Sequence, residues 1–496
     1  MPRSGIPGLP WIVVLACLPL LVTCGESGEG GDADTDVDVD TDADTDADTD
    51  TYPDWENLNF QNCEAPFNPW AAPERKLLSA PYLVNPKGDG VTLLWETFEN
   101  EPSFVMWGPG ETFTTVTCTT GETAPFDSDD FEDSHESFLH KAVLAGLEPG
   151  MRYSYTRPNA QVAVQDYEDV WYIGLVELKD MIAHPEEYDN HHYEVEWEGL
   201  GTWSFSTAPE PDEPFSLYVV GDNQSFSQYE IMVANSMEKF PADFYLHLGD
   251  IVQDGLFTEY PLNYLWMYRR VLAQTPSIHV SGNHEGDGRI IPYDSLFDIP
   301  AGEPVDINGT PTSAGPRTFT WDYGPIRMFM LDTQQDLGKD SVQYKWLDKE
   351  LEKAVKSAPH IRYLFPVWHR PLFTWKPGRL EAHIQDIHEL MKKWRVDAVW
   401  TGHTHWYERF LQDDVVYVVS GGGGAGLDTE RPEDIENTGF NRLAAKKAWH
   451  FLVGEGDKNQ IDFRTIESDL DFDTKEVVDV EIDSFTILAK DRSDLR

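Results

Sequence analysis

Residues 402–409 have the sequence GHTHWYER and directly follow an apolar stretch at 396–401. Four other polar clusters also follow apolar stretches: GDNQ at 221–224, GD at 249–250, GNHE at 282–285 and HRP at 369–371. Short apolar runs that end in polar clusters indicate buried strands. Ligands in layered α/β domains bind beyond the carboxyl ends of the strands. We therefore expect the five clusters to meet at one site.

Strand-like and helix-like patterns alternate from Phe215 onward, which predicts an α/β domain over residues 212–490. The predicted strands are 215–220, 243–248, 277–280, 363–367 and 396–401, followed by 415–419, 449–454, 461–467 and 483–487. The predicted helices are 229–240, 261–273, 343–355 and 383–394. The Pro-rich segment 208–214 is typical of a linker to the preceding residues.

The five clusters supply Asp, Asn and His side chains, which are ligands of borderline-to-hard divalent or trivalent metals. A glycine precedes the polar residue in every cluster except the one at His369, and it lets the backbone approach an ion closely. One aspartate shared between two ions would explain how so few acids could hold both. Two ions about 3.5–4 Å apart can clamp the attacking and leaving oxygens of a phosphate ester.

In this order, the clusters resemble those of the calcineurin-like metallophosphoesterase superfamily, and the resemblance spans residues 75–490. The sequences at 282–285 and 402–409 are similar to those of purple acid phosphatases, which also carry a fibronectin type III-like N-terminal domain. The resemblance implies a four-layer α/β/β/α sandwich. It also implies an acid phosphatase-like enzyme that hydrolyses phosphate monoesters by attack of a metal-bound hydroxide.

The same resemblance implies a dinuclear metal centre and no organic cofactor, and Asp250 would bridge the two ions. The first ion would take Asp222, Asp250 and His405, and the second Asp250, Asn283, His369 and His403. The ions would be divalent zinc, manganese or iron. An alternative for His369 is a structural role in its turn.

Three further residues are implied to face the substrate. His284 would bind the phosphate ester and protonate the leaving alkoxide, or it would only orient a neighbouring ligand. Arg289 and Arg370 are auxiliary candidates for the substrate phosphate. Arg409 is more typical of a structural pair with an acid.

Two glutamines stand where the related families have stronger metal ligands. Purple acid phosphatases have a tyrosine three residues after the bridging aspartate, and this chain has Gln253. The wider superfamily has a histidine two residues after the first aspartate, and this chain has Gln224. Either amide oxygen, or water, could fill the missing place. Because fewer anionic ligands disfavour Fe(III), we expect a colourless protein.

Residues 67–208 are rich in strand patterns, with predicted strands at 90–97, 104–108, 137–147 and 201–207. The stretch 147–153, LEPGMRY, resembles the corner of fibronectin type III sandwiches in which the Tyr hydroxyl bonds to the backbone. This resemblance implies an all-β sandwich before the α/β domain. Residues 160–199 form an insertion whose role the sequence does not indicate.

The N-terminus predicts export. Residues 1–24 resemble a lipoprotein signal, with Arg3, an apolar run and a lipobox-like end at Cys24, although an ordinary cleaved signal is an alternative. Residues 25–66 predict a disordered linker, with Asp at every second position from 32 to 50. The expected location is the bacterial cell envelope, through a lipid on Cys24, or the medium.

Two of the four cysteines, Cys63 and Cys118, lie after the predicted signal at residues 1–24. Cys63 and Cys118 could form one disulfide under oxidising conditions, or both could be buried free thiols.

The formal charge of the chain is −51, and residues 55–496 hold 36 basic and 75 acidic residues, a charge of −39. This balance argues against binding to nucleic acid or to anionic lipid, because both need a basic surface. The expected partner is a small phosphate ester, and the membrane is reached only through the lipid anchor. A phosphodiesterase and a catalytically decayed surface binding module remain the alternatives.

Overall fold

The computed structural model describes residues 59–61, 75–97, 100–111, 115–127, 136–156, 160–164, 196–199, 202–225, 227–257, 259–286, 290–376, 385–432, 440–470 and 477–496. Arg289, Cys24 and Cys63, together with nearly all of the predicted linker and much of the 160–199 insertion, lie outside these residues. Asp50–Arg496 cluster as one compact unit. Among the described residues, no helix is long and apolar enough to cross a bilayer.

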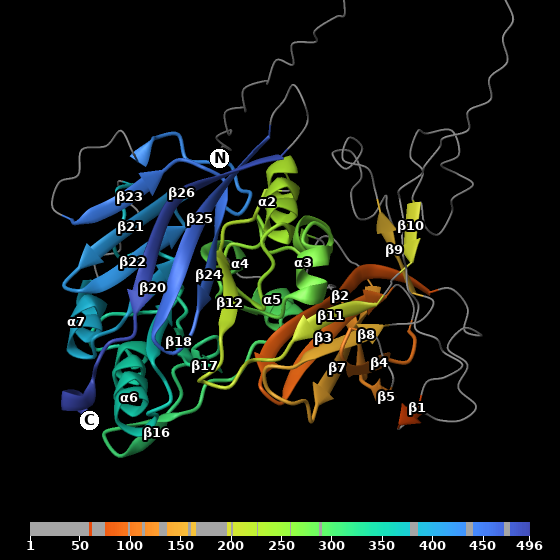
Figure 1. The fold of residues 1–496 in the computed structure, drawn as a ribbon, viewed down its shortest axis with the longest axis horizontal. Helices are drawn as coiled ribbons and strands as arrows, with labels where there is room; N and C mark the ends of the chain where they lie inside the picture. Colours follow the sequence, from red (N-terminus) through yellow and green to blue (C-terminus); the bar gives the residue numbers. More distant parts are fainter. Residues whose placement is uncertain are drawn as a thin grey trace, which may run out of the picture. The chain divides into compact units, whose positions relative to one another are not determined.

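Two large mixed sheets carry the α/β region (Figure 1). The first has the order β26 (Val477–Leu488), β25 (Gln460–Leu470), β24 (His450–Gly456), β12 (Phe215–Val220), β13 (Phe244–His247), β14 (Ser277–His279), β2 (Arg75–Lys87), β3 (Gly90–Thr97), β7 (Glu136–Ala145) and β6 (Glu122–Asp127), with β9 (Ala160–Val164) and β10 (Glu196–Gly199) off this path. The second has the order β17 (Phe319–Tyr323), β18 (Ile326–Met330), β19 (Tyr363–Val367), β20 (Ala398–Thr401), β22 (Val415–Ser420), β21 (Tyr407–Gln412) and β23 (Arg442–Lys446). A small hairpin pairs β15 (Val305–Ile307) with β16 (Thr310–Thr312).

The two large sheets pack face to face around an apolar core. Leu217 and Val219 of β12 meet Phe365 of β19 and Trp400 of β20 in this core. Helices α2 (Gln228–Glu238) and α3 (Arg269–Gln274) cover the outer face of the first sheet, and α6 (Val342–Ser357) and α7 (Gln385–Lys393) cover that of the second. The four layers expected from the sequence are therefore present.

Helix α6 shows how the local sequence produces these layers. Ser341 caps its first turn, because the Ser341 Oγ accepts a hydrogen bond from the Tyr344 N–H. Trp346, Leu347 and Leu351 lie on one side of the helix at spacings of one and four, so a single stripe is buried against the sheet. Helix α6 extends the predicted 343–355 segment at both ends.

The segment 261–273, predicted to be helical, is helical in the structure but is not one regular α-helix. The structure has a π-helix, η5 (Tyr260–Trp266), followed by the separate helix α3. Pro261 lies in the first turn of η5, where a missing backbone N–H costs no helical hydrogen bond, so proline is tolerated at this position. Two short helices, α4 (Asn283–Gly286) and α5 (Ile290–Leu296), follow β14.

The residues before 208 form two sheets around their own core. The second sheet of this pair has the order β1 (Asn59–Gln61), β5 (Thr115–Thr120), β4 (Phe104–Pro109), β8 (Arg152–Thr156) and β11 (Trp203–Ser206). Leu93, Trp95, Tyr155 and Phe205 fill the core between it and β2, β3 and β7. The Tyr153 hydroxyl accepts a hydrogen bond from the Glu148 N–H at 2.9 Å, which is the bond expected at the predicted corner.

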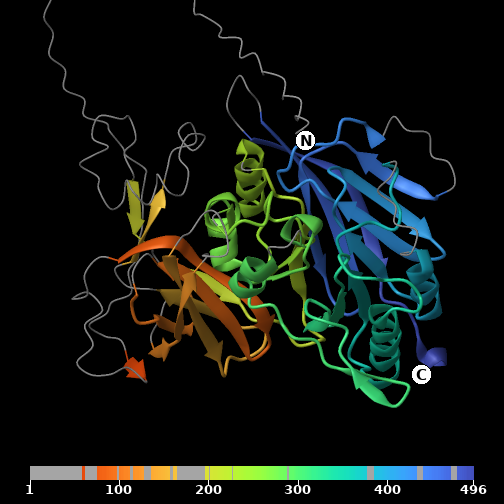
Figure 2. The same cartoon turned by 180° about the vertical axis from the view of Figure 1, so that it is seen from behind.

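The sandwich and the α/β region share a sheet, because β2 runs parallel to β14 with Val84 opposite Ser277. The Tyr82 hydroxyl of β2 donates to the Leu296 carbonyl, and the Trp321 Nε1 donates to the Pro86 carbonyl. Figure 2 shows the orange strands of the sandwich beside the green helices of the first sheet. Cys118 in β5 is disulfide-bonded, and its pairing with Cys63 stays a prediction, since the partner lies outside the described residues.

Candidate metal centre

The parallel strands deliver all five polar clusters to one edge of the two sheets. Strand β12 precedes 221–224, β13 precedes 249–250, β14 precedes 282–285, β19 precedes 369–371 and β20 precedes 402–405. The clusters interlock through their backbones: the Asp222 N–H donates to the Gly249 carbonyl at 2.9 Å, and the Gly402 N–H to the His369 carbonyl at 2.9 Å. These two backbone hydrogen bonds therefore connect four of the five turns, two by two.

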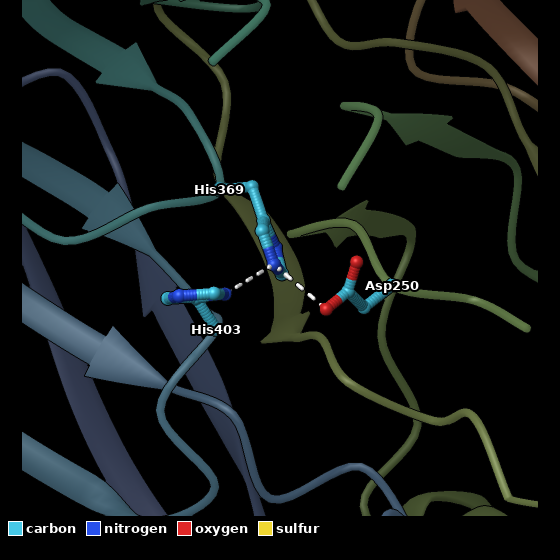
Figure 3. A group of neighbouring side chains, drawn as sticks. All are labelled: Asp250, His369 and His403. Carbon is cyan, nitrogen blue, oxygen red and sulfur yellow. Dashed lines mark hydrogen bonds and ion pairs between the residues drawn. The ribbon is translucent and has the colours of Figure 1, made fainter. Parts of the chain in front are cut away.

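Asp250, His369 and His403 come together as a buried group that could hold a metal ion (Figure 3). The Asp250 Oδ2 lies 2.9 Å from the His369 Nε2, which in turn lies 3.2 Å from the His403 Nδ1. The His369 Nδ1–H donates to the Leu248 carbonyl at 2.8 Å, which leaves Nε2 facing Asp250. Such an orientation is the one a metal-binding imidazole needs.

The charges of this group are strongly coupled. Burial lowers the pKa of His369, but the charges of Asp250 and Asp222 and the hydrogen bonds of the ring together raise it to about 9. Burial raises the pKa of Asp250, but its interactions with His369 and His284 together hold it below its ordinary value. Each of the two side chains therefore favours the charged form of the other.

Asp222 and His405 form a second pair of donors. The His405 Nε2 lies 3.5 Å from the Asp222 Oδ1, and the His405 Nδ1–H donates to the Gly426 carbonyl at 2.7 Å. Both carboxylate oxygens of Asp222 accept from the His403 N–H at 2.9 Å. The backbone of one predicted ligand thus positions the side chain of another.

The donor set fits divalent metal ions. Two ligand atoms that are each about 2.1 Å from one ion at a tetrahedral angle lie about 3.4 Å apart, close to the spacings observed in both groups. The Asn283 Oδ1 is buried and has no hydrogen-bond partner. Because a buried oxygen is rarely left unpaired, a cation at this position would satisfy it.

Three of the predicted ligands have a backbone conformation that is rare outside glycine. The φ angles of Asp222, Asp250 and His403 are 61°, 54° and 69°. Such strain costs about 1–3 kcal/mol per residue and concentrates at functional sites. A Cβ on Gly402 would collide with the Asp222 Oδ2, so glycine is required there.

Glu285 positions the site, and sequence reasoning did not assign it this role. Its carboxylate is fully buried and accepts from the N–H groups of Gly282 at 2.6 Å, Asp250 at 3.0 Å and Ile251 at 2.6 Å. Burial and the charge of Asp250 raise the pKa of Glu285 to about 7. Its place at the end of the GNHE cluster was the only available signal.

A buried hydrogen-bonded pair, His247 and Asn223, connects the turn that carries Asp222 with the turn that carries Asp250. The Gly249 N–H donates to the His247 Nδ1 at 3.1 Å, so the His247 Nε2–H donates to the Asn223 Oδ1. The Asn223 Nδ2 then donates to the Gly423 carbonyl at 3.3 Å. This chain of bonds fixes the turns after β12, β13 and β22 relative to one another.

The remaining predicted residues lie in different surroundings. The His284 Nε2 lies 3.8 Å from the Asp250 Oδ2, its side chain is 28% exposed, and its Nδ1–H donates to the Gln253 carbonyl. Gln253 is exposed, Gln224 is buried beside His405, and Arg370 is partly buried. Arg409 forms a double hydrogen bond with Asp483, as expected for a structural pair.

Residues 215–407 match the family model described as calcineurin-like phosphoesterase. These residues form a calcineurin-like phosphoesterase domain. The domain contains every predicted ligand and His284.

The phosphoesterase domain has relatives among purple acid phosphatases. The chain is 24% identical to purple acid phosphatase 23 of Arabidopsis thaliana over 324 residues, which cover 60% of this chain and 65% of that protein. It is 25% identical to the Fe(3+)-Zn(2+) purple acid phosphatase 12 of Arabidopsis thaliana, over 45% of this chain and 50% of that protein. The chain thus spans about half to two thirds of the length of these relatives.

The fold of the chain is similar to that of purple acid phosphatase PPD1 from yellow lupin (Lupinus luteus). The TM-score is 0.58 at 18% identity, and the likeness covers 84% of this chain and 76% of the lupin protein. The likeness in fold therefore extends beyond residues 215–407.

Glu285→Gln should weaken metal binding by about 10–100-fold, the usual cost of removing a group that orients a ligand. The amide would turn an N–H₂ group toward backbone N–H donors that now meet a carboxylate. Calorimetric titration of the metal-free protein with Zn²⁺ measures the effect. Glu259→Gln is the matched control, because Glu259 also accepts backbone N–H groups, but from Asp254 and Leu256, which are outside the predicted ligand set. Equal affinities for both variants would contradict the role of Glu285.

Proposed function

We propose that this chain hydrolyses phosphate monoesters with the help of two divalent metal ions. The observation that carries the proposal is the meeting of two groups of donor atoms at one edge of the phosphoesterase fold: Asp250, His369 and His403 in one group, and Asp222 and His405 in the other. Similarity to purple acid phosphatases supports the same reaction class. The buried, unpaired Asn283 Oδ1 supports the presence of a cation.

Bound divalent ions would supply positive charge for the phosphoryl oxygens and would lower the pKa of the attacking water. Asp250 would serve both ions: its Oδ2 faces His369, and a hydrogen bond from the His284 backbone N–H to its Oδ1, at 2.9 Å, holds the carboxylate in place. His369 and His403 would hold the second ion together with Asn283. With Gln253 in place of tyrosine, the first ion has no phenolate, so we expect a colourless protein.

His284 would move the proton that the leaving group needs. Its Nδ1–H is held by the Gln253 carbonyl, so the Nε2 is the atom that can carry a second proton. The Nε2 lies 3.8 Å from the Asp250 Oδ2 and the side chain is partly exposed, so a substrate can reach it. Protonation of the leaving alkoxide by such a group contributes about 10²–10⁴-fold to the rate.

Substrates with different leaving groups distinguish proton donation by His284 from a purely orienting role of this residue. His284→Asn should lower kcat by about 10²–10⁴-fold for an alkyl phosphate, whose alkoxide must be protonated. For p-nitrophenyl phosphate, whose phenolate leaves without a proton, the loss should be much smaller. Steady-state kinetics on both substrates measures the difference. Equal losses on the two substrates would show that His284 only orients its neighbours.

The reaction class is tested with purified, metal-free protein. We expect release of phosphate from aryl phosphate monoesters after addition of Zn²⁺, Mn²⁺ or Fe²⁺. A bis-aryl phosphate diester measured in parallel across pH decides between a monoesterase and a diesterase. Faster hydrolysis of the diester with every metal would replace our proposal by the phosphodiesterase alternative.

We also infer that the protein is exported and anchored by a lipid on Cys24, on the support of the signal-like sequence at 1–24. The strongly acidic body is compatible with an exported protein for which solubility dominates. Expression in a bacterial host with radiolabelled palmitate should label the wild-type chain and leave Cys24→Ser unlabelled. Equal labelling of both would contradict the anchor.

A further inference from the structure

Gln224 and Gln253 are the two amides that could complete the first metal position, and the structure separates them. Gln253 is exposed, and its contact with the site is through its backbone carbonyl, which accepts from the His284 Nδ1–H. Gln224 is only 2% exposed. Its backbone N–H donates to the Asp250 carbonyl at 3.3 Å, so the residue is held between the two aspartate turns.

The carboxamide of Gln224 has an unsatisfied buried oxygen. The Gln224 Oε1 has no hydrogen-bond partner, whereas the Nε2 lies 3.5 Å from the His405 Nε2. A buried acceptor without a partner costs about 1–3 kcal/mol. A buried polar atom in a folded protein is nearly always paired, with an ion or a water where no protein group reaches it.

The surroundings of the carboxamide are those of a metal ligand. The His405 Nδ1–H donates to the Gly426 carbonyl, so the Nε2 is the ring nitrogen that faces both the Asp222 Oδ1 and the carboxamide Nε2, each at 3.5 Å. Donor atoms of one tetrahedral ion lie about 3.4 Å apart. Rotation of the carboxamide by half a turn exchanges the positions of Oε1 and Nε2. Because Oε1 has no hydrogen-bond partner, this rotation gives up only the contact between Nε2 and His405.

We propose that the Gln224 carboxamide oxygen is a ligand of the ion held by Asp222 and His405. The assignment rests on the proposed function, because it concerns the first of the two ions. In the metal-free state the Gln224 Nε2–H donates to the His405 Nε2, and on metal binding the amide turns its oxygen toward the cation. A neutral oxygen ligand favours a divalent ion over Fe(III) at this position.

Co²⁺ alone is the probe for the test, because its visible bands report the ligands of each ion. Wild-type protein should bind two Co²⁺ ions per chain. Gln224→Leu should lower the affinity for one of them by at least about 10-fold and shift its visible bands. Gln224→Glu, which keeps an oxygen at the same position, should restore the affinity. Gln253→Leu is the matched control and should leave the affinities and the spectrum unchanged.

The possible outcomes distinguish a failure of the Gln224 assignment from a failure of the proposed function. Two Co²⁺ ions bound to Gln224→Leu with wild-type affinity and spectrum would overturn the assignment alone. A change in Gln253→Leu but not in Gln224→Leu would also overturn it, in favour of the other amide. A wild-type chain that binds no Co²⁺ would overturn the proposed function and the assignment with it. Equal thermal unfolding of the metal-free variants excludes a loss of fold as the cause.

Discussion

Asp250→Ala is expected to lower kcat/KM for an aryl phosphate monoester by about 10³-fold or more. Positive charge from bound ions contributes several kcal/mol to such reactions, and each 1.4 kcal/mol corresponds to about tenfold in rate. Asp250 lies 2.9 Å from His369, and its other oxygen accepts the His284 backbone N–H, so under the proposed function its removal would affect both ions and the proposed proton donor. Kinetics at saturating metal concentration measures the loss.

Asp254→Ala is the matched control for this experiment. It removes the same charge from an exposed position further along the same turn. We expect an activity within a few-fold of wild type, because an exposed surface charge contributes little. Similar activities of the Asp250 and Asp254 variants would show that Asp250 does not hold the metal centre together.

Arg492→Ala should lower the free energy of unfolding by about 3–5 kcal/mol, the usual result when one partner of a buried ion pair is removed. The guanidinium is 6% exposed and bonds to Asp397 and to the carbonyls of Arg395 and Arg362. These bonds hold the C-terminal segment after β26 against the start of β20. Urea denaturation measures the change.

The loss at Arg492 should depend on pH. Burial raises the pKa of Asp397 even though the charge of Arg492 lowers it, so without the arginine this pKa must rise further. A carboxyl with a raised folded-state pKa is tolerated while it is protonated, and it destabilises the fold as rising pH ionises it. The destabilisation relative to wild type should therefore be smaller at pH 5 than at pH 7.5.

Arg395→Ala provides the control for the stability experiment. Arg395 forms a double hydrogen bond with Asp494, but both side chains are largely exposed. Exposed pairs of this kind contribute about 0–1 kcal/mol. A loss at Arg492 as small as that at Arg395 would contradict a structural role for the buried pair.

The site could be located from the sequence because each chemical cluster directly follows a strand. The apolar runs before Asp222, Asp250 and His403 are short and buried, so their period and length were sufficient to predict β12, β13 and β20. Parallel strands end at one edge, which brings residues far apart in the chain together.

Other features depend on tertiary contacts that leave no local pattern. The pairing of Val84 with Ser277 joins segments far apart in the sequence, so the shared sheet could not be predicted. The sequence shows Glu285 only as an acid, and its role arises from the N–H groups of two separate turns that meet at its carboxylate. From the sequence, Gln224 and Gln253 are equal candidates for the missing metal ligand. In the structure Gln224 is buried and Gln253 is exposed.

We expect this phosphoesterase domain to need two divalent ions for phosphatase activity. The test is a titration of the metal-free protein with Zn²⁺ or Mn²⁺, with phosphate release from an aryl monoester followed at each step. We predict that activity rises with added metal and saturates at two ions per chain. No phosphate release above that of Asp250→Ala at any metal concentration would contradict this expectation and favour a surface binding module.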